Sequence, residues 1–247
     1  MTLASPIVEF RRYKLRPGAR ETLIELFERE LIEGQEDHGK TLIGQFREVA
    51  NPDVFTWLRG FPSMSRRAAA LERFYSGPVW SAHRAEANAT MLDVDDVLLL
   101  RPARPDSAFR LEGERAEIGS EQSSSGVIEA TILHLEDSPE SNGPVSFFES
   151  AIAAALEGAG GTVLGYFLTD KSPNNYPGLP IREDANVLAY FTGFPEGRRL
   201  EDRLAVDDAP GLARPPEVIV LEPTSRALLR ASSPACPIPT RRSRDAS

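Results

Sequence analysis

The chain contains two copies of one strand-and-turn pattern, and this internal repeat constrains its fold more than any other feature. In the first half, Leu42-Ile43-Gly44-Gln45-Phe46 is followed by Trp57-Leu58-Arg59-Gly60-Phe61-Pro62. In the second half, Val163-Leu164-Gly165-Tyr166-Phe167 is followed by Tyr190-Phe191-Thr192-Gly193-Phe194-Pro195. The opening segments also agree, because Val8-Glu9 corresponds to Ile128-Glu129. A unit repeated in this way indicates a duplicated small domain.

Each copy shows the order strand, helix, two strands, helix, strand, which predicts a ferredoxin-like α+β unit. The strands of the first copy are expected at 7–15, 41–49, 54–61 and 91–100. Those of the second are expected at 127–135, 162–168, 186–193 and 217–222, with helices at 145–158 and 196–205. Since each sheet has helices on one face only, the two bare faces can cover each other. The chain can thereby close a pseudo-dimeric barrel internally.

Composition shifts along the chain predict where the two units begin and end. We expect a first domain at 1–103, a linker at 104–126, a second domain at 127–230 and a disordered tail at 231–247. The second copy has an insertion at 170–184 that is rich in turn-forming residues, so a long loop is expected there. Such a loop either closes over a barrel mouth or makes a surface or dimer contact.

The charge and hydropathy of the chain limit its partners. A net charge of −9 and a pI near 5.0 argue against nucleic acid and against an anionic membrane as the main partner. No apolar run approaches the roughly 20 residues that a membrane span needs, and the N-terminus shows no signal-peptide pattern. The single cysteine, Cys236, excludes an intrachain disulfide framework. We therefore predict a cytoplasmic protein.

Several stretches resemble the NIPSNAP family. They include the opening run from Val8 to Gly18, Trp57-Leu58-Arg59-Gly60-Phe61, Pro78-Val79-Trp80 with His83-Arg84, and Ala87-Asn88-Ala89-Thr90-Met91. The second copy is similar to the companion domain of tandem bacterial members, including Asn174-Asn175-Tyr176-Pro177. The resemblance implies a dimeric α/β-barrel fold. It implies little about activity, because that superfamily includes monooxygenases, haem-dependent enzymes, isomerases and members without known chemistry.

Strand alternation places a polar row beside an aromatic row in the first copy. Glu9, Arg11 and Tyr13 share one face of the first strand, while Phe55, Trp57 and Arg59 share one face of the third. If both rows point into the barrel, they form an aromatic cavity whose guanidinium groups suit a planar carboxylate or enolate. The alternative is a buried Glu–Arg pair that only fixes the sheet.

The repeat assigns this cluster to the first copy alone. Arg11 corresponds to Thr131, and Arg59 corresponds to Thr192, whereas Glu9 is retained as Glu129. The second copy has therefore lost the cationic half of the cluster, and we expect it to serve mainly as a wall.

His83 is expected on the apolar stripe of a short helix, one turn after Trp80. A histidine there can shuttle a proton, ligate haem iron, or be a core residue satisfied by a backbone carbonyl. The three histidines are scattered along the chain, so no metal or cofactor is expected unless His83 binds haem. The candidate ligand-binding residues are completed by Trp80, Asn88, Asn175 and Tyr176.

Three functions remain open at this point. The first is binding of a small aromatic or anionic molecule in the first-domain cavity. The second is a cofactor-independent isomerase, decarboxylase or monooxygenase-like enzyme, with His83 as proton shuttle and with Arg59 and Arg11 stabilising an oxyanion. The third is a non-catalytic scaffold. A homodimer is left open, as is whether the barrel closes within one chain or between two.

Overall fold

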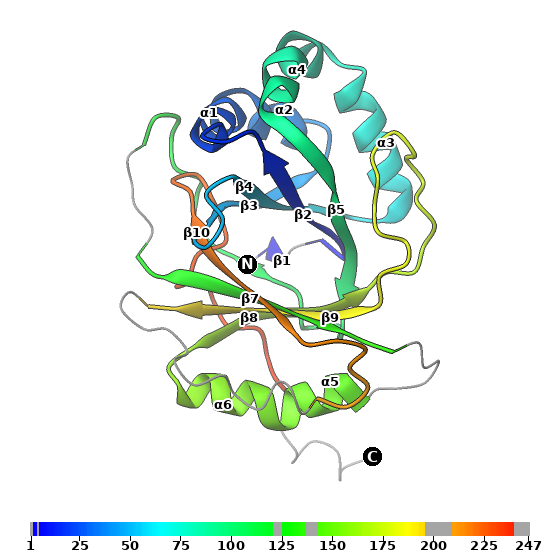
Figure 1. Cartoon of the computed structure of the whole chain (residues 1–247), viewed down its shortest axis with the longest axis vertical. Helices are drawn as coiled ribbons and strands as arrows, with labels where there is room; N and C mark the ends of the chain where they lie inside the picture. The colour runs from blue at the N-terminus through cyan, green and yellow to red at the C-terminus, as the bar shows by residue number, and fades with distance from the viewer. Residues whose placement is uncertain (1, 4, 121–124, 137–142, 196–208, 240–247) are drawn as a thin grey trace.

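Eight antiparallel strands form a closed barrel to which each half of the chain contributes four (Figure 1). The computed structural model describes residues 2–3, 5–120, 125–136, 143–195 and 209–239. The first half supplies β2 (Ile7–Leu15), β3 (Thr41–Glu48), β4 (Val54–Phe61) and β5 (Met91–Pro102). The second supplies β7 (Val127–His134), β8 (Thr162–Thr169), β9 (Val187–Phe194) and β10 (Glu217–Pro223). Two short strands, β1 (Thr2–Leu3) and β6 (Arg110–Leu111), pair separately.

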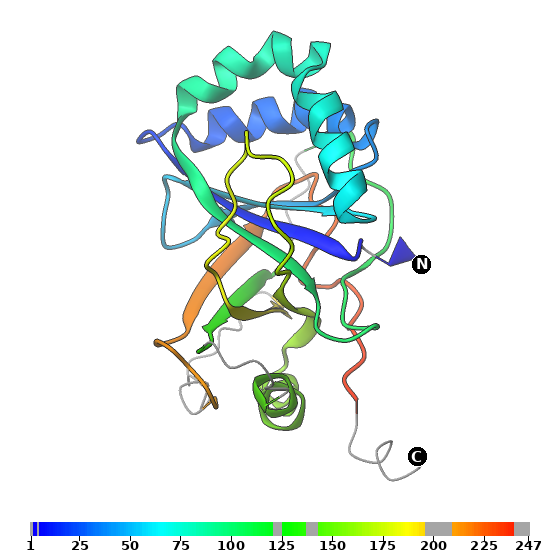
Figure 2. The ribbon, with the colours of Figure 1, turned by 90° about the vertical axis from the view of Figure 1, so that its right-hand side faces the viewer.

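Helices cover the two halves of the barrel from opposite ends of the molecule (Figures 1 and 2). The first half carries α1 (Arg20–Leu26), a π-helical segment (Phe27–Leu31), α2 (Ile32–Glu36), α3 (Met64–Tyr75) and α4 (Pro78–Thr90). The second half carries α5 (Gly143–Phe147), a π-helical segment (Phe148–Ile152) and α6 (Ala153–Gly158). The predicted helix at 196–205 lies outside the described residues. In the described part of the chain, no helix combines the length and hydropathy needed to cross a membrane.

The two halves are related as two copies of one sheet. Their strand orders, β3-β4-β2-β5 and β8-β9-β7-β10, are both that of a ferredoxin-like unit. The halves of the barrel join at two places, between β5 and β8 and between β10 and β3. The pairing is equivalent at both, because Pro102 of β5 pairs with Phe167 and Pro223 of β10 pairs with Phe46. The prediction of two ferredoxin-like units that close a barrel is confirmed, and the barrel closes within one chain.

The repeated glycines have one structural role in both copies. β3 and β8 each shift register against their neighbour at Gly44 and Gly165 respectively. A Cβ on Gly44 would lie 2.4 Å from Cζ of Phe46, and one on Gly165 would lie 2.9 Å from Cε2 of Phe167. Each phenylalanine therefore folds back over a bulge that a side chain would obstruct.

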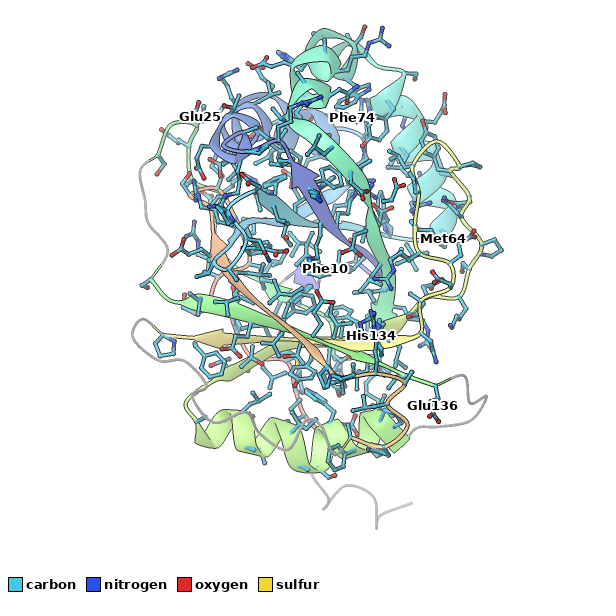
Figure 3. All side chains as sticks on the ribbon, viewed as in Figure 1. Phe10, Glu25, Met64, Phe74, His134 and Glu136 are labelled. Carbon is cyan, nitrogen blue, oxygen red and sulfur yellow. The ribbon has the colours of Figure 1, made fainter. Side chains whose placement is uncertain are left out.

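The barrel interior is filled with apolar side chains. One buried cluster contains residues from all eight barrel strands, among them Phe10, Phe46, Phe167 and Phe191. Phe10 lies inside the barrel in Figure 3, whereas Phe74 lies in the helical layer above it. An eight-stranded barrel is just wide enough for side chains to fill, and this one is filled.

Segments outside the strands complete the barrel core. Phe109, in the predicted linker, and Leu229, after β10, both belong to the interior cluster. The predicted disordered tail is wrong for residues 231–239, because Cys236 is buried and its N–H donates to the carbonyl of Val163 at 2.9 Å. Residues 240–247 lie outside the described part. Composition misled here because Pro and Ser serve equally in ordered extended segments.

At one end of the interior row of β2, Arg12 joins strands of both halves. Its guanidinium lies 2.7 Å from Glu48, 2.7 Å from Glu217 and 3.1 Å from Asp96. The interior row of β2 thus reads Val8, Phe10, Arg12, and the charged residue stands where the row leaves the apolar core.

Candidate functional site

The polar row of β2 faces the helices and not the barrel interior. Tyr13 and Trp57 belong to the cluster formed with α1, α2 and α3, whereas Val8 and Phe10 belong to the barrel cluster. Glu9 binds Arg67 of α3, so it lies on the same side as Tyr13. The expectation that this row lines the barrel cavity is wrong. Both faces of β2 are buried, so alternation separated the two rows without showing which one faces inward.

Glu9 binds three arginines in a fully buried cluster. Its Oε2 accepts from Nη1 of Arg11 at 2.8 Å and from Nε of Arg59 at 2.7 Å. Its Oε1 accepts from Nε of Arg67 at 2.6 Å, and all four side chains are 0% exposed. Burial opposes ionisation of Glu9, but attraction to Arg59, Arg11 and Arg67 holds its pKa well below the ordinary value. One carboxylate therefore faces three guanidinium cations, and the cluster carries excess positive charge.

Aromatic side chains surround the guanidinium groups, as the sequence predicted. Nε of Arg11 donates to the Tyr13 hydroxyl at 2.9 Å. The Trp57 ring lies 4.9 Å from the Arg59 guanidinium and 5.5 Å from that of Arg11, within cation–π range. Phe55 lies next along β4 and packs edge-on against Phe27 at 5.4 Å. The cluster is thus enclosed by apolar rings that keep its local dielectric low.

Several buried donors of this layer have no hydrogen-bond partner in the protein. They are Nη2 of Arg11, Nη2 of Arg59, Nη2 of Arg67, Nζ of Lys40, Nε1 of Trp57 and the side-chain amide of Gln45. Each unsatisfied buried donor costs about 1–3 kcal/mol, and more when it is charged. Their concentration in one layer of the first unit marks a place where an acceptor-rich group would be stabilised.

Two residues from the helices and one from the edge of β3 extend the cluster. Nη1 of Arg59 donates to Oε1 of Gln35 at 3.1 Å and lies 3.5 Å from the Tyr75 hydroxyl. Lys40 is 4% exposed, and its Nζ lies 4.0 Å from the centroid of the Phe74 ring. Burial, followed by repulsion from Arg59, lowers the pKa of Lys40 to about 6.

The inserted loop of the second unit reaches the helices of the first. It rises alongside α3 (yellow in Figures 1 and 2). Nη1 of Arg67 donates to Oδ1 of Asn175 at 2.7 Å and to Oδ1 of Asn174 at 3.2 Å. Nδ2 of Asn175 donates to the carbonyl of Met64 at 2.6 Å, and Tyr176 stacks on Tyr75 at 6.2 Å. Asn175 and Tyr176 therefore cover one side of the cluster, at the helices and not at a barrel mouth.

The structure does not bring His83 to this cluster. Nε2 of His83 lies 3.5 Å from Oε2 of Glu30, and the side chain is 25% exposed. Asn88 is exposed on the same helix, and Trp80 packs at the border of the layer, 5.1 Å from Tyr75. His83 was expected on the apolar stripe of this helix, but α4 buries only Ala87 and Thr90, and His83 lies beside Glu30 at the partly exposed margin.

Sequence reasoning missed Arg67, Lys40, Gln35 and Tyr75. Arg67 had a usable signal, because it stands at helical spacing from Ala70, Leu71 and Phe74, the other buried residues of α3. A charged residue in an apolar stripe is uncommon unless it is paired. Nothing local indicates the partner of Arg67, since Glu9 lies 58 residues away in the chain.

The corresponding layer of the second unit is aromatic. β7 and β9 pair Glu129 with Thr192, as β2 and β4 pair Glu9 with Arg59. The Phe148 ring packs 4.9 Å from Tyr166 and 4.7 Å from Tyr190. The second copy therefore has threonine at the position that is paired with the glutamate, where the first copy has arginine, as the sequence predicted. Within the described ranges of both copies, no three His, Cys, Asp or Glu side chains are arranged to hold a metal ion.

Comparison with known proteins gives relatives of the first unit and of the whole fold. The NIPSNAP family model matches residues 8–104. A NIPSNAP family protein from Agrobacterium tumefaciens is 25% identical, covering 41% of this chain and 92% of its own, with a TM-score of 0.38. A putative monooxygenase from Fusobacterium nucleatum is 8% identical and covers 97% of this chain and 100% of its own, with a TM-score of 0.53.

A second full-length likeness is to a putative monooxygenase from Lactobacillus acidophilus. It is 10% identical, covers 96% of this chain and 100% of its own, and has a TM-score of 0.51. At these identities the two full-length likenesses concern the fold alone. No curated protein matches the chain.

Proposed function

We propose that this chain, whose residues 8–104 form a NIPSNAP domain, binds a small organic anion in the guanidinium cluster of that domain. The observation that supports the proposal is the set of buried, unpaired donors that Arg11, Arg59 and Arg67 present around a single carboxylate. Three buried cations that share one carboxylate are only partly compensated, so an anion that accepts from their free Nη2 donors gains both Coulombic and hydrogen-bond energy.

The surroundings select the chemistry of the ligand. Guanidinium groups match the two oxygens of a carboxylate, and the rings of Trp57 and Tyr13 favour a flat apolar body. An aromatic carboxylate or an enolate fits this combination better than a neutral molecule does. The site lies between the first sheet and its helices, and its ligand enters by displacement of α3 or of the loop that holds Arg67.

Two other functions have weaker support. The enzyme that uses His83 as proton shuttle lacks its geometry, because His83 of α4 lies 3.5 Å from Glu30 of the π-helical segment and not beside the guanidinium groups. A scaffold accounts well for the filled barrel interior. It leaves no reason for the excess of cations in one copy, since the other copy keeps the same strand register without them.

Calorimetric titration with benzoate tests the proposal. We expect wild-type protein to bind benzoate, and Arg59→Thr to bind at least about tenfold more weakly, because it loses a charge-assisted hydrogen bond. Threonine is the residue that the second copy carries at this position, so the change is compatible with the strand. Arg101→Thr on β5 is the matched control, because Arg101 is exposed. Equal binding by all three proteins, or no binding by wild type, would reject the proposal.

A further inference from the structure

Lys40 is the one buried lysine of the chain. The sequence contains three lysines, at positions 14, 40 and 171. Lys14 and Lys171 are exposed, whereas Lys40 is 4% exposed and its Nζ makes no hydrogen bond to the protein. Buried lysines are rare unless they are paired, so this amine needs an explanation.

The position of Lys40 brings its amine beside the guanidinium cluster. Leu42 pairs with Arg59 across β3 and β4, and Lys40 lies two residues before Leu42, next to the first residue of β3. Its Nζ lies against Phe74 of α3, so Lys40 faces the helices as Leu42 does. Diagonal neighbours of this kind are about 7–8 Å apart. Both side chains also approach Tyr75, because Nζ of Lys40 lies 5.7 Å from the ring centroid and Nη1 of Arg59 lies 3.5 Å from the hydroxyl.

The charged groups around Lys40 favour its uncharged form. Burial is the main cause, and Arg59 of β4 and Arg73 of α3 add repulsion, while Glu9 of β2 opposes them. Together they lower the pKa of Lys40 to about 6, so most of the amine is unprotonated at neutral pH. An uncharged lysine amine is a nucleophile toward carbonyl carbons, and desolvation beside another cation is an established way to produce one.

We propose that Lys40 forms an imine with the carbonyl carbon of an oxo acid whose carboxylate binds the guanidinium groups of Arg11 and Arg59. The inference rests on the proposed function, because the same cluster would hold the carboxylate. It narrows the ligand from organic anions in general to those that carry an aldehyde or ketone next to the acid group.

The reaction is a condensation that needs no oxidant or reductant. The Nζ lone pair forms the C–N bond, and the carbonyl oxygen takes up a proton as the nitrogen loses one, which gives a carbinolamine. The carbinolamine hydroxyl then leaves as water, and the C=N bond forms in its place. The products are one imine and one water molecule for each amine and carbonyl consumed.

Reductive trapping tests the inference on the full chain. The protein is incubated at pH 7 with glyoxylate and sodium cyanoborohydride, digested, and analysed by mass spectrometry for carboxymethylation of each lysine. We expect Lys40 to be modified at least about tenfold faster than Lys14 and Lys171, because an ordinary lysine amine is almost wholly protonated at this pH. Benzoate, which has a carboxylate but no reactive carbonyl, should slow the modification at Lys40 only.

The controls separate this inference from the proposed function. Lys40→Met keeps an unbranched side chain of similar length without the amine, and it should abolish the fast modification while thermal unfolding confirms the fold. If benzoate binds in calorimetry but Lys40 reacts no faster than the exposed lysines, the imine is rejected and anion binding stands. Fast modification that benzoate does not slow would show that Arg11 and Arg59 do not bind the carboxylate of the reacting molecule. The assignment of the ligand to oxo acids would then be rejected.

Discussion

The two halves of the molecule carry different side chains on one framework. In the first unit, β2 and β4 present Glu9 and Arg59 to the helices, and in the second, β7 and β9 present Glu129 and Thr192 at the same register. Trp57 corresponds to Tyr190, which packs with Phe148. Since the strand order and the glycine bulge are the same in both, the cationic cluster is not required for the fold. Residues retained at a cost in one copy only are the best candidates for function.

Both copies also contain a π-helical segment in the helix that follows the opening strand, at Phe27–Leu31 and Phe148–Ile152. Such segments are frequent at functional sites. Because this one occurs in the charged and in the aromatic unit alike, it belongs to the repeated framework. The comparison therefore separates an inherited irregularity from a feature confined to one unit.

The largest expected effects should be alike in the two halves, because the barrel interior is shared. Phe46 and Phe167 occupy equivalent positions and are both 0% exposed. We expect Phe46→Ala and Phe167→Ala each to lower the free energy of unfolding by about 3–5 kcal/mol. Urea denaturation measures both. A loss in one variant only would show that the two halves do not form a single cooperative core.

Removal of the buried carboxylate should distinguish the halves. Glu9→Gln leaves three guanidinium groups without their shared anion, so we expect a loss of about 3–5 kcal/mol in unfolding free energy. Glu129→Gln is the matched variant of the second unit, where Thr131 and Thr192 replace two of these cations, and its loss should be smaller. Equal losses, measured by urea denaturation, would contradict the account of the first unit.

The contribution of Glu9 to the free energy of unfolding should also decrease as the pH falls. The pKa of Glu9 is lower in the folded protein than in the unfolded chain, so its stabilisation is complete above the unfolded value and is lost as pH falls toward the folded one. The stability difference between wild type and Glu9→Gln should therefore be constant from pH 7 to about 5 and narrow below about pH 4. A difference that grows with acidification would refute the ion-pair assignment.

A smaller effect is expected at the contact between the units. Asn175→Ala removes the acceptor that lies 2.7 Å from Nη1 of Arg67, a charge-assisted hydrogen bond worth about 1.5–3 kcal/mol. Part of that loss should be recovered by solvent, because Asn175 is exposed. Urea denaturation should show a change near the lower end of this range. No change would mean that the loop does not hold Arg67.

The architecture could be predicted from the sequence more completely than the candidate site. The repeat predicted the two units and the internal barrel, because strand order and the glycine bulge depend on local spacing. It also identified Glu9, Arg11, Arg59, Tyr13 and Trp57 as one cluster, since alternation along paired strands places them together. It could not assign that cluster to the helical face, because both faces of β2 are buried.

The rest of the site depends on packing between distant segments. Arg67 and Lys40 join the cluster only when α3 and the start of β3 pack against the sheet. His83 was misplaced for a related reason, because its spacing on α4 fits an apolar stripe of which the packing buries only the end, at Ala87 and Thr90. A short helix with few apolar residues does not fix its own orientation.

The most direct test of the account is a calorimetric titration of benzoate into wild-type protein, Arg59→Thr and Arg101→Thr. The account predicts comparable binding by wild type and Arg101→Thr, and binding at least about tenfold weaker by Arg59→Thr. Arg59→Thr should remain folded, because the second unit carries threonine at the same register position. Benzoate binding that is indifferent to Arg59 would show that the guanidinium cluster only fixes the sheet to its helices.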